Sequence, residues 1–299
     1  MTSMSGDFGH RYTRLMACGA MLLVATSCGA PDEGRAAREP SVGPIEPLTS
    51  TLNLLLPLDQ YMLSLSDYRR LAEARRILVR RCMQRLGIDY KAQARPGTGL
   101  QTRNERRYGI TDQGEARQFG YRKPQPPTAE TPPDSAQDPK MFALLFGKSA
   151  TRYTSRPVPA GGCVGEAHRG LATGRSAGVE DVAQPLAMKS WSMSAADSRV
   201  RQVFATWSAC MKRAGFDYPT PLEVLQDREL RAESSPAQRA TAVADTACKR
   251  EHNVVSVWAA VEAAYQSALI EENRSALDLQ RQANATRLRL AAAVLIKNR

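Results

Sequence analysis

The chain has 299 residues, of which 42% are hydrophobic and 24% are charged, and its formal net charge at pH 7 is +11. Its length is enough for one large domain or two small ones. The positive charge is unevenly placed, since the segment from Asp67 to Lys123 holds 15 Lys and Arg against 6 Asp and Glu. An exported basic region excludes nucleic acid as the expected partner, and the amino terminus predicts export.

A short basic region at the amino terminus precedes an apolar or small run from Leu15 to Ala25. This run is too short to span a bilayer, which needs about 20 residues. The pattern is that of a secretory signal peptide covering residues 1–27. It ends in Val24-Ala25-Thr26-Ser27-Cys28, which resembles a bacterial lipobox and predicts acylation of Cys28. The alternative is ordinary cleavage and release of a free secreted protein.

Residues 28–56 contain several prolines and glycines and show no periodicity until Leu52. We therefore expect a flexible tether there, which would hold the folded part off the membrane surface. The folded part is then residues 57–299. We expect it to be a mainly α-helical, irregular bundle.

One nine-residue stretch occurs twice, and it indicates how the bundle is held together. Residues 82–90 read CMQRLGIDY and residues 210–218 read CMKRAGFDY, with six of nine positions identical. Each stretch follows a helical apolar pattern and carries a glycine, Gly87 or Gly215, where a left-handed residue would end the helix. The spacing predicts a Schellman stop, with an apolar contact across the glycine.

The cysteines predict two disulfides. Of the six, Cys18 leaves with the signal peptide and Cys28 carries the predicted lipid, so four remain in an oxidising compartment. Four cysteines allow three pairings, and the repeat selects one of them, because a second cysteine follows each copy. The predicted bonds join the cysteines at these positions: Cys82 to Cys163, and Cys210 to Cys248.

Helical periodicity predicts most of the remaining elements. Residues 91–160 have no counterpart in the second copy and form a loop-rich insertion, and residues 173–193 read as a second loop. The last helix is expected to be long, with one break near Asn253 or Asn273. Helices are predicted over Ser66–Leu86, Asp112–Phe119, Met141–Phe146, Cys163–Leu171, Ala195–Ala214, Leu222–Glu233 and from Pro236 to the C terminus.

The insertion 91–160 is where a binding site is expected, because loops on a rigid scaffold often carry function. Its basic and aromatic residues could stack on sugar rings and hold phosphate or carboxylate; they are Arg103, Arg106, Arg107, Tyr108 and Tyr121. Anionic lipid headgroups, phosphate-bearing wall polymers and peptidoglycan carboxylates are the expected anions. The alternatives are that the tyrosines pack the loop onto the helices and that the arginines form a solvated face.

No catalytic signature stands out. Cys163, His168, Cys248 and His252 have the chemistry of zinc ligands, but disulfide pairing of the cysteines is the expected outcome. Glu262 and its neighbours on the long helix read as a solvated face. We therefore expect no metal, no cofactor and no enzyme active site.

Several short motifs at characteristic spacing carry a resemblance to a family. They are Pro57-Leu58-Asp59-x-Tyr61, Cys82-Met83 with Gly87, Arg107-Tyr108-Gly109, Gly120-Tyr121, Gly162-Cys163 and Cys210-Met211. The chain resembles the uncharacterised secreted lipoproteins of actinobacteria over most of residues 57–270. The resemblance implies compartment and architecture, and it implies no activity.

The function expected from the sequence is that of a non-catalytic binding or accessory protein of the cell envelope. Its place would be the outer face of the cytoplasmic membrane, held there by the lipid on Cys28. One alternative is an envelope hydrolase with an unrecognised site. Another is a subunit of an export or signalling complex, with a partner protein bound through the C-terminal helix, residues 274–299.

Overall fold

The computed structural model describes residues 39–48, 50–91, 99–122, 138–147, 152–153, 156–227, 230 and 235–298. The predicted signal peptide and Cys28 lie outside these residues. Within them the chain is mainly α-helical, with two disulfides and a long C-terminal helix, which confirms the predicted fold class. In this part of the chain no helix combines the length and the apolar character needed to cross a membrane.

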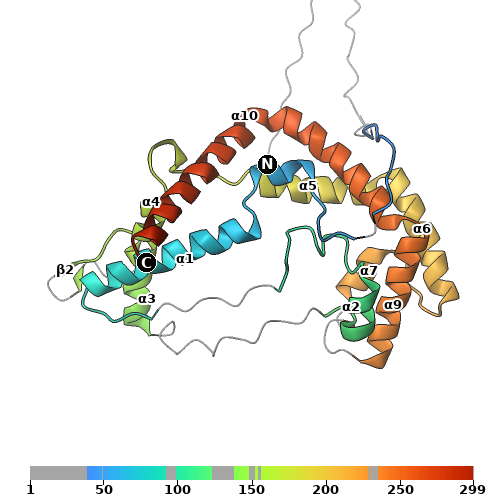
Figure 1. The fold of residues 1–299 in the computed structure, drawn as a ribbon, viewed down its shortest axis with the longest axis horizontal. Coiled ribbons are helices and arrows are strands. Elements are labelled where there is room, and N and C mark those ends of the chain that lie inside the picture. The colour runs from blue at the N-terminus through green and yellow to red at the C-terminus, as the bar shows by residue number, and fades with distance from the viewer. Residues whose placement is uncertain are drawn as a thin grey trace, which may run out of the picture. The chain divides into compact units, whose positions relative to one another are not determined.

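The described elements are helices of very different lengths and one small antiparallel ribbon of two strands (Figure 1). In order they are η1 (Pro57–Tyr61), α1 (Leu65–Arg85), α2 (Gln113–Phe119), α3 (Pro139–Phe146), β1 (Arg152–Tyr153), β2 (Arg156–Pro157), α4 (Gly162–Gly170), η3 (Gly174–Ser176), α5 (Ala183–Ala196), α6 (Ser198–Arg213), α7 (Pro221–Gln226), α9 (Pro236–Glu251) and α10 (Val254–Ile296). Helix α10 contacts η1, α1, α5 and α6, and the fold is organised on it.

Both copies of the repeated stretch end a helix as the sequence predicts. Gly87 and Gly215 have φ of 87° and 90°, which a residue without Cβ adopts easily. The amide of Ile88 donates to the Met83 carbonyl at 3.0 Å, and the amide of Phe216 donates to the Met211 carbonyl at 2.9 Å. These are the long-range bonds of a Schellman motif, so the helix stops of α1 and α6 are confirmed.

The disulfide pairing selected by the repeat is also confirmed. Cys82 bonds to Cys163 and thereby joins the end of α1 to the start of α4, with Cα atoms 5.5 Å apart. Cys210 bonds to Cys248 and joins α6 to α9, with Cα atoms 5.8 Å apart. All four cysteines are buried. Each bond therefore fixes a helix pair from inside its own hydrophobic cluster.

The prediction of a tether over residues 28–56 is wrong for its second half. The Glu39 carboxylate accepts hydrogen bonds from Ser198 at the start of α6, and the Leu48 amide donates to the hydroxyl of Ser256 on α10 at 2.8 Å. Val42, Leu48 and Leu54 pack against the main core. The folded unit therefore includes residues from Glu39 onward, because scattered apolar side chains with no local period can still be buried by distant helices.

The loop predicted over residues 173–193 is wrong as well, since α5 occupies its second half. The buried face of α5 consists of small residues, Ala183, Ala187, Ser190 and Ser194. The two serine hydroxyls donate to backbone carbonyls three residues earlier, at 3.0 and 2.9 Å. Because each hydroxyl has a hydrogen-bond partner, its burial leaves no unpaired polar group. A face of alanine and serine gives no apolar period, although it packs closely on α10.

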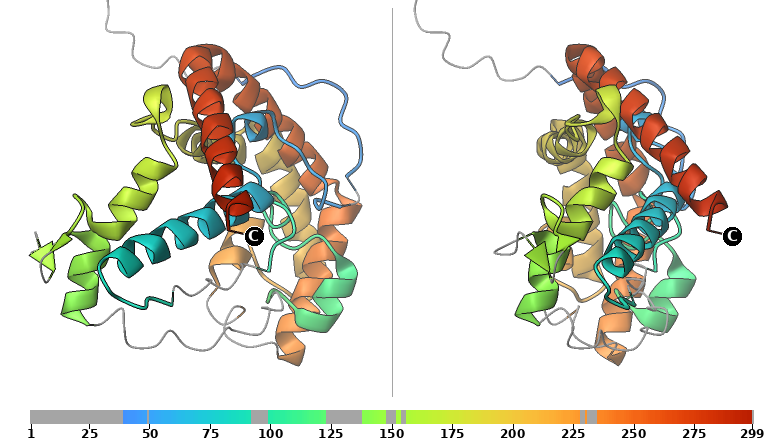
Figure 2. Two further views of the ribbon diagram at one scale, coloured as in Figure 1. Left: turned by 60° about the vertical axis from the view of Figure 1, so that its left-hand side comes forward. Right: turned by 90° about the vertical axis from the view of Figure 1, so that its left-hand side faces the viewer.

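The sequence predicts one break in the last helix, near Asn253 or Asn273, whereas the backbone departs from helical geometry at both residues. Asn253 adopts a left-handed conformation with φ of 51° and separates α9 from α10. Asn273 has non-helical backbone angles within α10, and its side-chain Nδ2 donates to the Leu269 carbonyl at 2.8 Å. Figures 1 and 2 show α10 as two limbs that meet at a bend. The second limb packs on α1 through an apolar cluster that includes Leu71, Leu288 and Ala291.

The insertion 91–160 is divided between two parts of the fold (Figure 2). Residues 99–122, which include α2, pack beside α9. Helix α3 instead packs against α4 and α1, next to the first disulfide. Helix α7 is shorter than the predicted Leu222–Glu233, because Asp227 is extended and ends it. The described parts of the insertion therefore belong to the scaffold of the fold.

Candidate functional site

Arg107 and Tyr108, two of the residues predicted to bind a ligand, lie inside the protein on the carboxylate of Glu262. Arg107 Nε donates to both carboxylate oxygens, at 3.0 and 2.9 Å, and its Nη2 donates to the Ala187 carbonyl at 2.8 Å. The Tyr108 hydroxyl donates to Glu262 at 2.8 Å. Ser190 and Gln266 donate to the same carboxylate. This buried network joins the insertion to α5 and α10.

Burial and charge in this network shift the pKa values of Arg107 and Tyr108. Burial lowers the pKa of Arg107, but the hydrogen bonds and charge of Glu262 outweigh it and raise the pKa above its usual range. Burial and the same carboxylate raise the pKa of Tyr108 well above its ordinary value. Arg107 therefore stays charged and Tyr108 stays neutral in this network.

The interpretation of Glu262 as part of a solvated face is wrong, because its side chain is 0% exposed. A signal was present in the sequence. Glu262 follows Trp258 by four residues and precedes Tyr265 by three, which places it on the buried stripe of α10. An ionisable residue on an apolar stripe indicates a buried partner, and the partner, Arg107, lies 155 residues away.

Tyr121 lies in a second buried network, on α9. Its hydroxyl donates to Asp245 at 3.2 Å, and the same carboxylate accepts from Trp207 Nε1 at 3.0 Å and from Lys249 Nζ at 2.9 Å. Burial, followed by the charge of Asp245, raises the pKa of Tyr121 far above its ordinary value. Arg106 donates to the carboxylate of Glu115 at 2.8 Å. Tyr121 and Arg106 therefore both bind other residues of the protein and help to hold the fold together.

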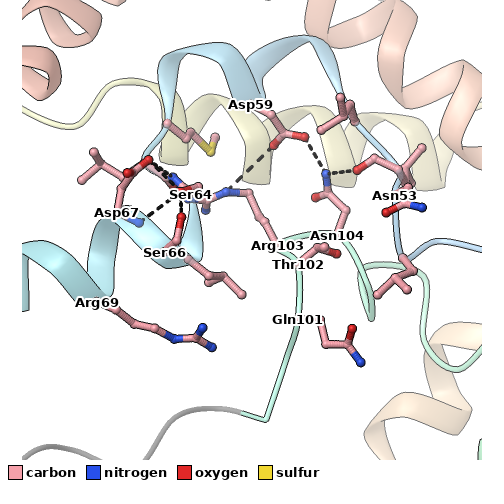
Figure 3. A pocket seen from close by; sticks show the side chains of 16 residues that line it. Asn53, Asp59, Ser64, Ser66, Asp67, Arg69, Gln101, Thr102, Arg103 and Asn104 are labelled. Carbon is pink, nitrogen blue, oxygen red and sulfur yellow. Dashed lines mark hydrogen bonds and ion pairs between the residues drawn. The ribbon is translucent and has the colours of Figure 1, made fainter.

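Arg103 is the predicted site residue that borders a cavity. A pocket of about 490 Å³ lies between the segment 101–104, η1 and the start of α1 (Figure 3). The Arg103 guanidinium donates to the Leu63 carbonyl, lies 3.9 Å from the Asp59 carboxylate and stacks 5.8 Å from the Tyr68 ring centre. Arg103 thus holds the two walls of the pocket together.

Asp59 organises the polar wall of this pocket. Its carboxylate accepts from the Leu56 amide at 2.8 Å and from Asn104 Nδ2 at 2.6 Å, as Figure 3 shows for Asn104. Asn104 Nδ2 also donates to the Leu54 carbonyl at 3.0 Å. Because the amide nitrogen has two acceptors, the orientation of the Asn104 amide is fixed by its contacts.

Two oxygen atoms in this wall lack a hydrogen-bond partner among the described residues. They are Asn104 Oδ1 and Thr102 Oγ1, and both are buried. Asn104 is only 2% exposed. An unpaired buried oxygen costs about 1–3 kcal/mol, and such groups in a folded protein call for an explanation. Both residues line the pocket.

The rest of the lining makes the pocket uncharged overall and partly apolar. Its apolar lining residues are Leu52, Leu54, Leu55, Met62, Leu63 and Leu65. The charged lining residues balance, with Asp59 and Asp67 against Arg69 and Arg103. Asp67 is engaged in capping α1 through Ser64. The pocket is therefore suited to a molecule with hydroxyl or amide donors and an apolar face.

The described residues do not support the zinc alternative. Cys163 and Cys248 are both in disulfides, and zinc binds the thiolate form of cysteine. A grouping of Cys210, Glu251 and His252 has the right spacing for a metal ion. Its cysteine is also oxidised, which leaves a carboxylate and an imidazole.

Comparison of the chain with protein-family models, with curated proteins and with solved structures finds no match. The resemblance to actinobacterial lipoproteins therefore stays a prediction from the motifs alone. The function must be argued from the geometry of the site.

Proposed function

We propose that the protein is a non-catalytic binding protein of the cell envelope. Its place is the outer face of the cytoplasmic membrane, where a lipid on Cys28 anchors it. The two buried disulfides support an oxidising compartment. The signal sequence and the small residues before Cys28 support the lipid anchor.

The binding site in this proposal is the pocket bordered by segment 101–104. The observation that carries it is the pair of buried, unpartnered oxygens, Asn104 Oδ1 and Thr102 Oγ1, in the pocket wall. An amide oxygen accepts hydrogen bonds, and a threonine hydroxyl both donates and accepts. The ligand must therefore bring donors, and the balanced charge of the lining favours an uncharged one.

A sugar unit of an envelope glycan meets these requirements best. Its hydroxyl groups would form hydrogen bonds with Asn104 and Thr102, and its C–H face would pack on the leucine side chains that line the pocket. The volume of about 490 Å³ is within the range of small-molecule sites. Arg103, the residue predicted to meet the ligand, acts in this proposal by positioning the wall through Leu63 and Asp59.

Replacing Thr102 with valine tests this site, because it has opposite effects on stability and on binding. The change removes a buried hydroxyl without a partner, so we expect the free energy of unfolding to rise by about 1 kcal/mol. Affinity for uncharged oligosaccharides released from purified cell wall should fall about 3- to 10-fold, the worth of one neutral hydrogen bond. Urea unfolding and isothermal titration calorimetry measure the two effects.

Thr206→Val is the matched control, since the Thr206 hydroxyl is on the exposed part of α6 and donates to the Val203 carbonyl at 2.9 Å. It should leave oligosaccharide binding unchanged. The proposed site is wrong if Thr102→Val binds the oligosaccharides as tightly as the native chain, or if the control loses as much affinity.

A separate prediction concerns the anchor. Cys28→Ser removes the thiol that would be acylated, so we expect the protein to leave the membrane fraction and appear in the soluble exported fraction. Cell fractionation with immunoblotting measures this, and a mass shift of the native protein by acyl chains supports it. A native protein that is already soluble would contradict the anchor and leave the oligosaccharide experiment unaffected.

A further inference from the structure

A second cavity, which we call the basic pocket, lies on another side of the start of α1. It has a volume of about 710 Å³. Tyr68, Leu71 and Arg75 come to it from α1, and the end of α4 with the residues that follow contributes His168, Arg169 and Leu171. Arg287 reaches it from the second limb of α10. Three helices that are far apart in the sequence therefore build it.

The base of the basic pocket is apolar. Leu71 and Leu171 are 7% and 4% exposed and belong to the cluster that packs α10 on α1. Ala72, Ala172 and Ala177 continue this lining with small side chains. The charged groups stand around the apolar base, with Arg75, His168 and Arg169 exposed to solvent. The pocket thus combines an apolar floor with a cationic rim.

The charge of the rim is all of one sign. Three arginines and a histidine line the pocket, and none of the lining residues carries a carboxylate. Arg287 donates to neutral acceptors only, namely Asn284 Oδ1 at 3.2 Å and the carbonyls of Ser176 and Val179 at 3.3 and 3.0 Å. Neither Arg287 nor Arg169 forms an ion pair with a described residue.

Several arginines of α1 outside the pocket lining, by contrast, form ion pairs. Arg70 pairs with Asp67, Arg76 with Glu73, and Arg85 with Glu166 on α4. The positive charge of the rim also affects the pKa of its histidine, His168. Burial lowers the pKa of His168, and the charges of Arg75 and then Arg287 lower it further. Positive charge from two other helices therefore converges on one point beside an apolar floor.

We propose that the basic pocket binds an anionic amphiphile, with its phosphate or carboxylate on Arg169 and Arg287 and its chain on Leu71 and Leu171. Guanidinium groups suit such oxyanions because they offer two parallel donors. An apolar chain gains from the leucine floor, whereas a free anion does not. The basic pocket shares only Leu63 with the described lining of the pocket bordered by segment 101–104. It supplies the anion binding that the sequence placed in the insertion.

Dodecyl phosphate, used below its critical micelle concentration, is the probe for this proposal, with inorganic phosphate and dodecyl maltoside as comparisons. We expect dodecyl phosphate to bind and the other two to bind at least about tenfold more weakly, because each lacks one of the two features. Equal binding of inorganic phosphate would overturn the role of the apolar floor. Equal binding of dodecyl maltoside would overturn the role of the charged rim.

Two substitutions localise the site. Arg169→Gln removes an exposed charge from the rim, and Ala72→Glu adds an opposing charge on α1; each should weaken dodecyl phosphate binding about tenfold or more. Arg289→Gln is the matched control, since Arg289 is an exposed residue of α10 that donates to Thr286 and does not line the pocket. Unchanged affinity in both rim variants would overturn the proposal.

The His168 ring gives a readout that does not depend on affinity. An anion seated among Arg75, Arg169 and Arg287 offsets their charges, so the pKa of His168 should rise when dodecyl phosphate binds. Proton NMR of the ring during a pH titration measures it, and an unchanged pKa at saturation would contradict the site. Vesicles of phosphatidylglycerol distinguish the source. Retention of the Cys28→Ser protein by the vesicles favours a membrane lipid, and loss of retention when Arg169→Gln is added ties it to this pocket.

Thr102→Val keeps the two sites distinguishable. It should abolish neither dodecyl phosphate binding nor the shift of His168, whereas Arg169→Gln should leave oligosaccharide binding unchanged. Loss of both ligands in either variant would contradict the assignment of two separate sites.

Discussion

Replacing Arg107 with methionine is expected to lower the free energy of unfolding by about 3–5 kcal/mol at pH 7. The change leaves Glu262, which is 0% exposed, without its counter-charge, and breaking one side of a buried ion pair costs this much. Urea unfolding followed by circular dichroism measures it. A loss below about 1 kcal/mol would show that the pair does not hold the insertion to α10.

Two further variants separate the buried pair from general effects of losing an arginine. Arg107→Met with Glu262→Gln keeps acceptors for Tyr108 and Ser190 without the stranded charge, so it should be more stable than Arg107→Met alone at pH 7. Arg274→Met removes an exposed partner of Glu271 on α10 and should change stability little. If all three variants were equally unstable, the network would not be the cause.

Removing either disulfide is expected to destabilise the native protein by about 4 kcal/mol. The closed loops span 81 and 38 residues, and the chain-entropy model gives a cost of this size for both. Paired Cys→Ala substitutions, Cys82 with Cys163 or Cys210 with Cys248, allow each bond to be removed without leaving a free thiol. Thermal unfolding of the two double variants measures the effect.

The two disulfide variants should differ in where the structure loosens. Loss of the Cys82–Cys163 bond should raise amide hydrogen exchange in α3 and α4, which pack with the end of α1. Loss of the Cys210–Cys248 bond should do so in α9 and α6. A thermal midpoint identical to that of the native protein in either variant would contradict the contribution assigned to that bond.

Local rules explain what was predictable from the sequence. A glycine after an apolar helical stripe is enough to end a helix, so the stops at Gly87 and Gly215 follow from neighbouring residues. The pairing of the cysteines follows because the stop and its cysteine are duplicated. Asn253 and Asn273 interrupt a long helical pattern, and both sites depart from helical geometry.

What the sequence did not predict depends on contacts between distant residues or on small side chains. Arg107 and Glu262 are 155 residues apart, and Leu48 and Ser256 are 208 apart. No local period reports such pairs. Helix α5 was missed because alanine and serine form its buried face. The pocket at Asn104 was missed because its other wall, at Leu54 and Asp59, comes from the segment read as tether and from the turn after it.

Mapping amide chemical shifts during titration with uncharged cell-wall oligosaccharides shows whether segment 101–104 lines a ligand site. We expect saturable shifts at residues 101–104 and 52–67, with residues 168–172 unaffected. Shifts confined to other parts of the chain, or none at saturating oligosaccharide, would contradict the proposed site.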